Sequence, residues 1–188
     1  MKVILEHMEK EVFKWCQIEY KHISKIIGKD NLIFTNIQKK YKNKLNNLGE
    51  VNTKSVKGLN IKRLCVLDPR AKKVLSPEDG KLFDYFVFGG ILGSEIMGGR
   101  TKKELKIHGV ARRNLGKVQM PTDIAVLVTK KIIKNKIPFS KLKFKDEIEI
   151  PIKRGISTIL PYRYLIEKGK VILAPGLKDY LRKEDSFD

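Results

Sequence analysis

The sequence is poor in residues that build disulfides or metal centres. It contains two cysteines and three histidines in 188 residues. Cys16 and Cys65 each stand in apolar company, and neither belongs to a CxxC motif or a Cys/His cluster with ligand spacing. His7, His22 and His108 are equally dispersed. We therefore expect two reduced thiols in the core and find no indication of metal dependence in the sequence.

Several long or repetitive patterns are also missing. No apolar run approaches the roughly 18 residues of a membrane span, and no signal peptide precedes the short strand pattern at the start of the chain. Neither GxGxxG nor the phosphate-loop motif GxxxxGKS/T occurs, which argues against a dinucleotide-binding fold and a nucleoside triphosphatase. No Pro/Gly/Ser-rich linker divides the chain. These absences predict a single cytoplasmic domain over 1–188 with no membrane partner.

Acidic residues are in the minority. The chain has 21 Asp and Glu residues against 40 Lys and Arg residues, a formal net charge of +19. Such a charge attracts polyanions such as RNA or a ribosomal particle, although it reads no base sequence. The alternative is a lysine-rich composition that only solvates the surface, since lysine predominates over arginine.

Hydrophobic patterning predicts an α/β domain with a parallel sheet. The strand KVILEH is followed by a helix over 9–27 that ends at Gly28, then by the strand NLIFTN and a weakly amphipathic helix over 37–48. Two more strands are expected at 63–68 and 83–88. The strand–helix–strand–helix order favours parallel pairing, and parallel strands that end in loops on one side form a ligand crevice.

The C-terminal half predicts one long helix and antiparallel segments. Residues 121–136 have a helical pattern with proline in the first turn and lysines in the last. EIEIPIKRG alternates apolar and charged residues, which predicts a half-exposed strand or arm, and Pro151 favours an edge position. We then expect a strand, a hairpin turning at Lys168 and Gly169, and a helical turn over 177–182.

Two glycine-containing loops are the most informative features of the chain. FDYFVFGGILG (83–93) is an apolar strand pattern that runs into bare backbone, and RRNLGKVQMPTD (112–123) is a tight loop that leads into a helix start. Glycines at a strand end are common in turns, so the first loop alone is a weak signal. Together the two loops predict that backbone groups approach one flat ligand.

These two strings resemble the SPOUT class of S-adenosylmethionine-dependent methyltransferases, in the branch of ribosomal-protein arginine methyltransferases and their archaeal relatives. LCVLDPRAKKVLSPEDG, the N-terminal KVILEHMEKEVFKWCQIEYKHI and LPYRYLIEKGKVILAPGL extend the resemblance over nearly the whole chain. The resemblance implies an α/β fold of SPOUT type, a largely parallel sheet flanked by helices with a C-terminal trefoil knot, and a knotted part over roughly 63–188. It also implies S-adenosylmethionine as cofactor.

The resemblance assigns the site residues by position. Glu6, Glu19 and their neighbours are candidates for gripping an arginine acceptor, whose charge carboxylates would localise. Each assignment has a structural alternative. The glutamates could lie on a solvated helical face, Tyr20 could be a core residue, and Arg100 could form a surface salt bridge. Thr122 and Asp123 could be plain helix-start residues. The catalytic candidates are Glu6, His7, Glu19, Tyr20 and Arg100. The expected cofactor cradle comprises Phe88, Gly89, Gly90, Leu92, Gly93, Leu115, Gly116, Gln119, Met120, Thr122 and Asp123.

The acceptor is less sharply defined than the reaction. The first expectation is an arginine of a ribosomal protein, by resemblance. The second is a base or ribose of rRNA or tRNA, for which Arg112 and Arg113 would contact phosphates. The third is a non-catalytic RNA- or ribosome-binding module. SPOUT enzymes are usually dimers, yet this branch can act as a monomer, which is the state we expect.

The sequence departs from the branch in three places. After GGILG it has Ser94 and Glu95 and then a pair of glycines, where relatives carry an acidic residue and prolines. Ile156 and Ile159 replace acidic residues of the arginine-modifying relatives, which weakens the arginine-acceptor interpretation. A surplus of lysine over 39–62 would extend an RNA-facing surface.

Overall fold

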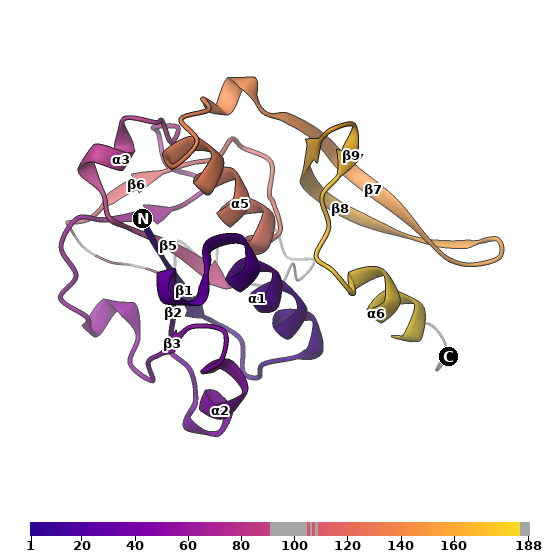
Figure 1. The fold of residues 1–188 in the computed structure, drawn as a ribbon, viewed down its shortest axis with the longest axis horizontal. Helices are drawn as coiled ribbons and strands as arrows, with labels where there is room; N and C mark the ends of the chain where they lie inside the picture. The colour runs from indigo at the N-terminus through magenta and orange to yellow at the C-terminus, as the bar shows by residue number, and fades with distance from the viewer. Residues whose placement is uncertain (91–104, 106, 108, 185–188) are drawn as a thin grey trace.

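A six-stranded parallel sheet forms the centre of the molecule. The computed structural model describes residues 1–90, 105, 107 and 109–184 (Figure 1). Within this part, the strand order is β3-β2-β1-β5-β4-β6, and every pairing in the sheet is parallel. The strands are β1 (Lys2–His7), β2 (Leu32–Thr35), β3 (Glu50–Val51), β4 (Leu64–Leu67), β5 (Tyr85–Gly90) and β6 (Ala111–Arg113).

Two helices cover one face of this sheet. α1 (Lys14–Ile27) connects β1 to β2, and α5 (Thr122–Ile133) packs directly against α1. Figure 1 shows the two helices side by side in front of the strands. Successive residues of a strand point to opposite faces. Val3 and Leu5 of β1 therefore join the core under the helices, whereas Ile4 joins a second, smaller core on the other face.

The predicted strands are confirmed, and the N-terminal helices are shorter than predicted. α1 begins at Lys14 instead of residue 9. Before it, the carbonyls of Lys10 and Val12 accept hydrogen bonds from the side-chain amides of Gln38 and Gln17, in place of helical backbone N–H groups. The helix ends at Gly28 as expected, in a left-handed conformation with φ 81°. Instead of a helix over 37–48, the chain forms two short helices, η2 (Lys39–Tyr41) and α2 (Lys42–Leu45).

Several short elements had no counterpart in the sequence prediction. They contain three or four residues each, too few for a hydrophobic period to show. They are η1 (Lys29–Asn31), η3 (Val56–Gly58), α3 (Asp79–Leu82) and η4 (Phe139–Lys141), together with the strand β6.

The C-terminal segment forms an antiparallel sheet that extends to one side of the body in Figure 1. It consists of β7 (Lys143–Lys153), β8 (Ile156–Glu167) and β9 (Lys170–Val171), with β7 at the edge as predicted. Lys168 and Gly169 form the turn with φ of 49° and 74°, the conformation of a tight two-residue hairpin. The helix α6 (Leu177–Glu184) packs against β7.

The structure tests some of the other sequence predictions and leaves others open. Both cysteines are free and buried, as expected. None of the described helices is long and apolar enough to cross a membrane. The trefoil knot and the single-domain assignment stay predictions, because residues 91–104 of the knotted part lie outside the described residues.

Candidate active site

Four of the predicted site residues lie together where the parallel strands β1 and β5 end. In the pairing of β1 with β5, Glu6 lies beside Gly89 and His7 beside Gly90. On its other side, Glu6 is the partner of Thr35 at the end of β2. The glycines that end β5 therefore lie next to the end of β1, at the edge where open α/β sheets bind ligands.

Glu6 lies on the face opposite to α1 and is held by internal donors. Its side chain is 3% exposed, and its carboxylate accepts hydrogen bonds from Thr35 Oγ1 (2.5 Å), Ser55 Oγ (2.5 Å) and the Val56 backbone N–H (2.9 Å). These three bonds occupy most of the roughly four lone-pair positions of a carboxylate. Glu6 thereby anchors the segment before η3 to the end of β1.

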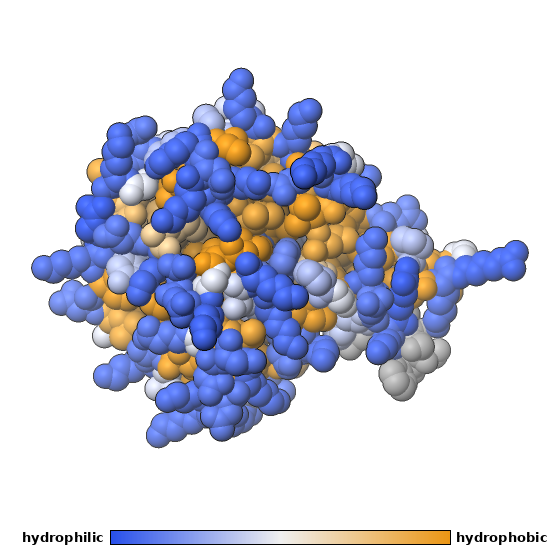
Figure 2. Space-filling model, viewed as in Figure 1, coloured by the Kyte–Doolittle hydropathy of each residue, from blue (hydrophilic) through white to orange (hydrophobic). Residues whose placement is uncertain are grey.

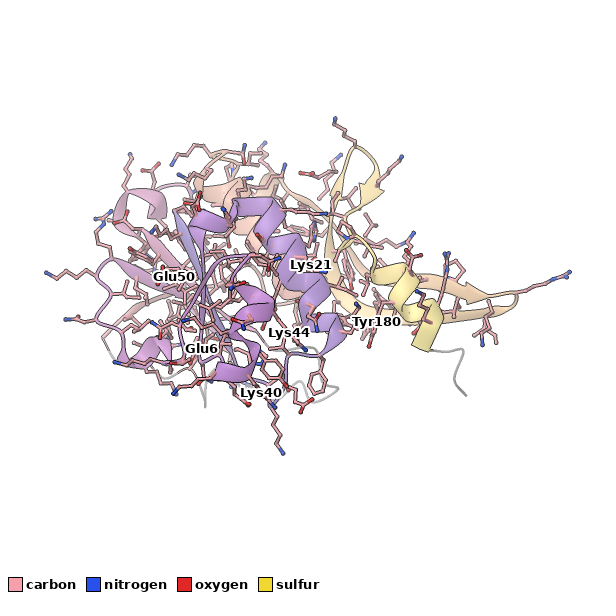
Figure 3. All side chains as sticks on the ribbon, turned by 60° about the horizontal axis from the view of Figure 1, so that its bottom comes forward. Glu6, Lys21, Lys40, Lys44, Glu50 and Tyr180 are labelled. Atoms are coloured by element: carbon pink, nitrogen blue, oxygen red, sulfur yellow. The ribbon has the colours of Figure 1, made fainter. Side chains whose placement is uncertain are left out.

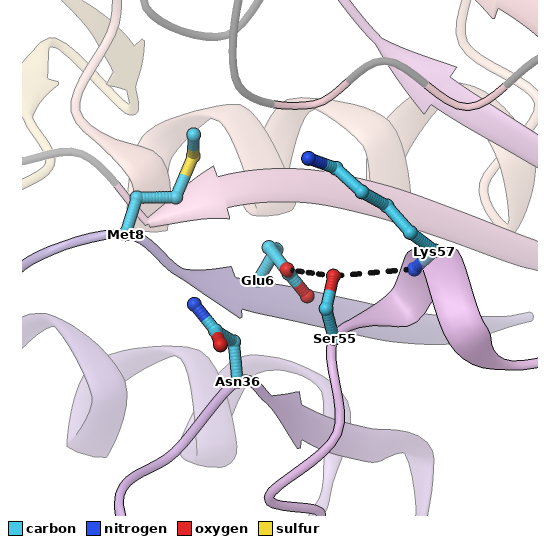
Figure 4. A pocket seen from close by; sticks show the side chains of 5 residues that line it. All are labelled: Glu6, Met8, Asn36, Ser55 and Lys57. Atoms are coloured by element: carbon cyan, nitrogen blue, oxygen red, sulfur yellow. Dashed lines mark hydrogen bonds between the residues drawn. The ribbon is translucent and has the colours of Figure 1, made fainter.

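A pocket of about 260 Å³ opens at this carboxylate. Figure 4 shows Met8 and Lys57 on opposite sides of Glu6, with Asn36 and Ser55 completing the lining. Asn36 is in turn fixed by donating its side-chain N–H to the carbonyl of His7 at 2.7 Å. The pocket thus combines one buried anion with one cation at its rim.

His7 and Tyr20 form a separate pair under α1. The Tyr20 hydroxyl lies 2.8 Å from His7 Nδ1, and the tyrosine ring packs on Phe34 with 5.1 Å between centroids. Burial lowers the pKa of His7 and raises the pKa of Tyr20 well above its usual value. Both side chains are 2% exposed. The structure therefore separates this pair from Glu6 and gives Tyr20 the position of a core residue.

Glu19 lies in a third place, beside the start of α5. Its carboxylate accepts a hydrogen bond from Trp15 Nε1 at 2.8 Å, one turn earlier on α1. Asp123 Oδ2 lies 2.6 Å from His22 Nδ1, and Asp123 Oδ1 accepts from its neighbouring backbone N–H. Glu19 is 7% exposed and Asp123 2%. We call Trp15, Glu19, His22, Thr122 and Asp123 the α1–α5 acidic cluster.

The buried carboxyl group of Glu19 is disfavoured in its charged form. Burial, and then the negative charge of Asp123, raise the pKa of Glu19 from its ordinary value of 4.5 to about 8. Hydrogen bonds from Trp15 and Thr122 oppose this rise without cancelling it. Glu19 is therefore largely protonated at neutral pH, and a cation placed between the two carboxyl groups would stabilise its ionised form.

Tyr164 of β8 adds a polar group that the sequence analysis missed. Its side chain is 1% exposed, and its hydroxyl has no hydrogen-bond partner among the described residues. Burial raises its pKa, and the charges of Asp123 and Glu19 raise it further. Nothing in the sequence joins Tyr164 to helix α1. His22, in contrast, follows Glu19 by three residues, a helical spacing that could have identified it.

The second glycine loop follows β6 and is shaped by Gly116. This residue has φ 87°, and a Cβ atom there would lie 2.9 Å from the Phe139 ring. Its backbone N–H donates to Asn114 Oδ1 at 2.9 Å, which closes the turn. Leu115 is buried, Met120 is half-buried, and Gln119 is exposed.

The remaining cradle residues are divided between the described and undescribed parts of the chain. Phe88 is buried in β5, and Gly89 and Gly90 end this strand. Leu92, Gly93 and Arg100 lie outside the described residues, as do Ser94 and Glu95. In the described part, the glycines that end β5, the bare backbone at Gly116, apolar side chains and a carboxylate at the helix start form a set of groups that fits a flat, positively charged cofactor.

Arg112 and Arg113 have internal partners. Arg112 Nη1 lies 2.9 Å from Asp68 Oδ2, and Arg113 Nη2 lies 2.8 Å from Asp79 Oδ1. The arginine side chains are 27% and 14% exposed, and the carboxylates are nearly buried. Arg112 thus holds β6 to the segment after β4, and Arg113 holds it to α3, while the phosphate contact stays a prediction.

Two further observations bear on the acceptor and on metals. Ile156 and Ile159, which stand where acidic residues were expected, are 53% and 58% exposed on β8. Among the residues described, no group of three or more His, Cys, Asp or Glu side chains could hold a metal ion.

Comparisons with known proteins identify the family. A family described as "Protein arginine N-methyltransferase SFM1-like" matches residues 2–186. Protein arginine N-methyltransferase SFM1 of Saccharomyces cerevisiae is 40% identical over 206 aligned residues, covering 99% of this chain and 96% of the yeast protein.

Solved structures agree with this relationship. The yeast arginine methyltransferase SFM1 complexed with SAM superimposes with a TM-score of 0.88 and 38% identity, covering 98% of this chain and 91% of that chain. Dual-specific Trm10 from Thermococcus kodakaraensis superimposes with a TM-score of 0.57 and 15% identity, over 75% of this chain and 96% of its own, and shares the fold alone. The sheet therefore has the SPOUT-type fold, and the chain belongs to the SFM1-like family of protein arginine N-methyltransferases.

Proposed function

We propose that this protein transfers a methyl group from S-adenosylmethionine to an arginine side chain of a protein. The support is membership of the SFM1-like family over residues 2–186 and a SAM complex of a relative of nearly equal extent. The structural observation that carries the proposal is the α1–α5 acidic cluster, because it brings the buried carboxyl group of Glu19 on α1 close to that of Asp123, which follows the second glycine loop at the start of α5.

The cofactor would be held by the ends of β5 and β6. Gly89 and Gly116 allow the backbone to approach the adenosine, and Leu115 and Met120 supply apolar contact. When bound, S-adenosylmethionine supplies an electrophilic methyl group. Asp123, fixed by His22 at 2.6 Å, contributes negative charge next to this loop.

The acceptor guanidinium would lie against Glu19 and Asp123. A guanidinium has a pKa near 13.8, so it arrives as a cation and must be oriented by anions. Charge-assisted hydrogen bonds to carboxylates fix its plane and localise its charge on one side. The Glu19 carboxylate, whose pKa is raised by burial, is suited to take up the proton that the methylated nitrogen loses. The Tyr164 hydroxyl has no hydrogen-bond partner among the described residues and feels the charges of Asp123 and Glu19, so it is available as a further polar contact for the acceptor.

Glu6 is the alternative grip, because it lies beside Gly89 at the pocket with Asn36 and Lys57. Its three internal hydrogen bonds leave less capacity for a guanidinium, and the Lys57 ammonium opposes a second cation there. Comparing Glu6→Gln with Glu19→Gln in methyl transfer decides between the two sites. For the same change in stability, we expect Glu19→Gln to lower kcat/KM more than Glu6→Gln does.

We further propose that the acceptor belongs to a ribosomal protein, free or in the ribosomal particle, and that the enzyme acts in the cytoplasm as a monomer. A net charge of +19 favours a partner within a ribonucleoprotein. Incubating ribosomal proteins from cells that lack this enzyme with S-adenosylmethionine should yield methylarginine, detected by mass spectrometry of the hydrolysed protein. Absence of methylarginine, with full cofactor binding, would overturn the proposal.

RNA methylation is the second candidate, favoured by the same charge. The support for RNA methylation is weaker, because Arg112 and Arg113, the residues expected to contact RNA phosphates, already bind carboxylates. A non-catalytic ribosome-binding module is a third, and calorimetry separates it from an enzyme, since such a module would not bind S-adenosylmethionine.

A further inference from the structure

We infer that the lysine-rich surface after β2 binds the phosphodiester backbone of RNA, beside the pocket that contains Glu6. Residues 39–62 carry seven lysines and a single acidic residue, Glu50. All seven lysines are exposed. The lysines of this surface, called the β2–β4 lysine surface below, are Lys39, Lys40, Lys42, Lys44, Lys54, Lys57 and Lys62.

The positive charge of this surface is largely uncompensated within the described part of the chain. There, the one ion pair of these lysines joins Lys40 to Glu11 at 3.9 Å, with both side chains 57% exposed. Such an exposed pair contributes little and is readily exchanged for another anion. The other six ammonium groups thus have no ion-pair partner among the described residues.

Two of the ammonium groups are oriented by one aromatic ring. Lys40 Nζ and Lys44 Nζ lie 4.8 and 5.6 Å from the centroid of Tyr41. Tyr41 itself is 8% exposed and packs in the core, so it fixes the two lysines without being available to a base. Figure 3 shows Lys40 and Lys44 on the side of the molecule that carries α2.

The surface is tied to the candidate active site. Backbone hydrogen bonds join Asn36 N to the Lys54 carbonyl (2.9 Å), and Ser55 and Val56 bind the Glu6 carboxylate. Lys57 lines the pocket at Glu6 (Figure 4). A polyanion on the lysine surface would therefore lie at the mouth of this pocket. Hydrophilic side chains dominate the same region in Figure 2, where α2 lies in Figure 1.

The chemistry of the surface fits an RNA backbone. Lysine ammonium groups contact phosphates, and such contacts position a nucleic acid without reading its sequence. Tyr41 is the one aromatic residue of the segment 39–62, and its ring is buried. The segment therefore has no aromatic side chain on which an unpaired base could stack. These features favour a base-paired RNA. The choice of RNA over DNA rests on the proposed function, in which the acceptor protein belongs to a ribonucleoprotein.

The test is direct binding of a fluorescein-labelled 24-base-pair RNA duplex to the full chain, followed by anisotropy at several salt concentrations. A variant removes four lysines of the surface and is compared with a control that removes four exposed lysines from the other end of the molecule. The surface variant carries Lys40→Gln, Lys42→Gln, Lys44→Gln and Lys54→Gln. The control variant carries Lys141→Gln, Lys143→Gln, Lys145→Gln and Lys168→Gln.

We expect the surface variant to bind the RNA at least tenfold more weakly at low salt. The slope of log K against log salt should fall by about 3, since each lost phosphate contact contributes roughly 0.7 to 0.9. The control variant should stay within about threefold of the wild type. Equal losses in both variants would overturn the inference, because they would indicate bulk charge alone. Tighter binding to a DNA duplex of the same sequence or to polyglutamate would overturn it as well.

The binding assay contains no cofactor and no acceptor protein. Failure of RNA binding therefore leaves arginine methylation standing, and failure of methyl transfer leaves the RNA surface standing. Methyl transfer to a free acceptor protein, measured with the same variants, should be unaffected by the surface substitutions.

Discussion

Glu19→Gln is expected to stabilise the folded protein while it removes activity. Glutamine has nearly the same shape as glutamate, and its oxygen can still accept the hydrogen bond from Trp15 Nε1 that is 2.8 Å long in the structure. Its amide N–H groups can donate to Asp123, which removes the repulsion between two buried carboxyl groups. The substitution therefore keeps the packing and deletes the negative charge that Glu19 acquires at high pH.

The size and sign of the stability effect follow from the pKa of Glu19. A pKa raised from 4.5 to about 8 corresponds to a cost on the order of 5 kcal/mol for ionising this group in the folded state. The unfolded chain loses the proton first, so the folded state is not penalised below about pH 4.5, and the penalty grows until it is complete above about pH 8. Above pH 8, Glu19→Gln should exceed the wild type by several kcal/mol in urea denaturation, and its advantage should shrink toward pH 5.

The activity should change in the opposite direction. Loss of one hydrogen bond between charged groups costs about 1.5 to 3 kcal/mol, or roughly 10- to 150-fold in kcat/KM. Wild-type kcat/KM should rise with pH up to about 8, as the free enzyme gains the carboxylate form of Glu19 that binds the guanidinium. Methyl transfer to the acceptor protein across pH 6 to 9 measures both effects. A Glu19→Gln variant with wild-type kcat/KM, or one that is destabilised at pH 8.5, would refute this role of the cluster.

Three further predictions address the loops and the core. Gly116→Val should weaken S-adenosylmethionine binding at least tenfold in calorimetry, because φ is 87° and a Cβ would lie 2.9 Å from Phe139; Gly176→Val, with the same φ and nothing within 4 Å, is the control that should retain binding. Asp79→Asn should cost about 3 kcal/mol in urea denaturation, since it leaves the largely buried Arg113 unpaired; a loss below about 1 kcal/mol would contradict the structural role of this pair. Burial raises the pKa of the two cysteine thiols to about 11 and about 12, so both should resist a thiol reagent at pH 8 until urea unfolds the chain, and rapid labelling of the native protein would contradict their core positions.

The sequence predicted the fold well where a hydrophobic period was long enough to show. The strands at Lys2–His7 and Leu32–Thr35 and the helix at Thr122–Ile133 are apolar runs that the structure buries. β6 was missed, because its arginines look solvent-facing in sequence. Their burial depends on Asp68 and Asp79, carboxylates 44 and 34 residues away, and no local pattern reports such pairs.

The candidate site was harder to predict, because it depends on which face of a strand each side chain takes and on which helices pack against each other. Glu6 and His7 are neighbours in sequence and were grouped together, yet strand alternation sends them to opposite faces, a split that the sequence could have revealed. Glu19 and Asp123 were proposed for different tasks. Their meeting depends on the packing of α1 against α5, across more than one hundred residues of chain, as does the His22–Asp123 contact.

The central claim is that the methyl acceptor is a protein arginine. The most direct measurement is transfer of a radiolabelled methyl group from S-adenosylmethionine to ribosomes from cells lacking this enzyme, followed by separate protease and ribonuclease digestion. Label released by protease as methylarginine, and reduced at least tenfold with Glu19→Gln, is the predicted result. Label that ribonuclease releases and protease leaves in place would contradict the claim and make this chain an RNA methyltransferase.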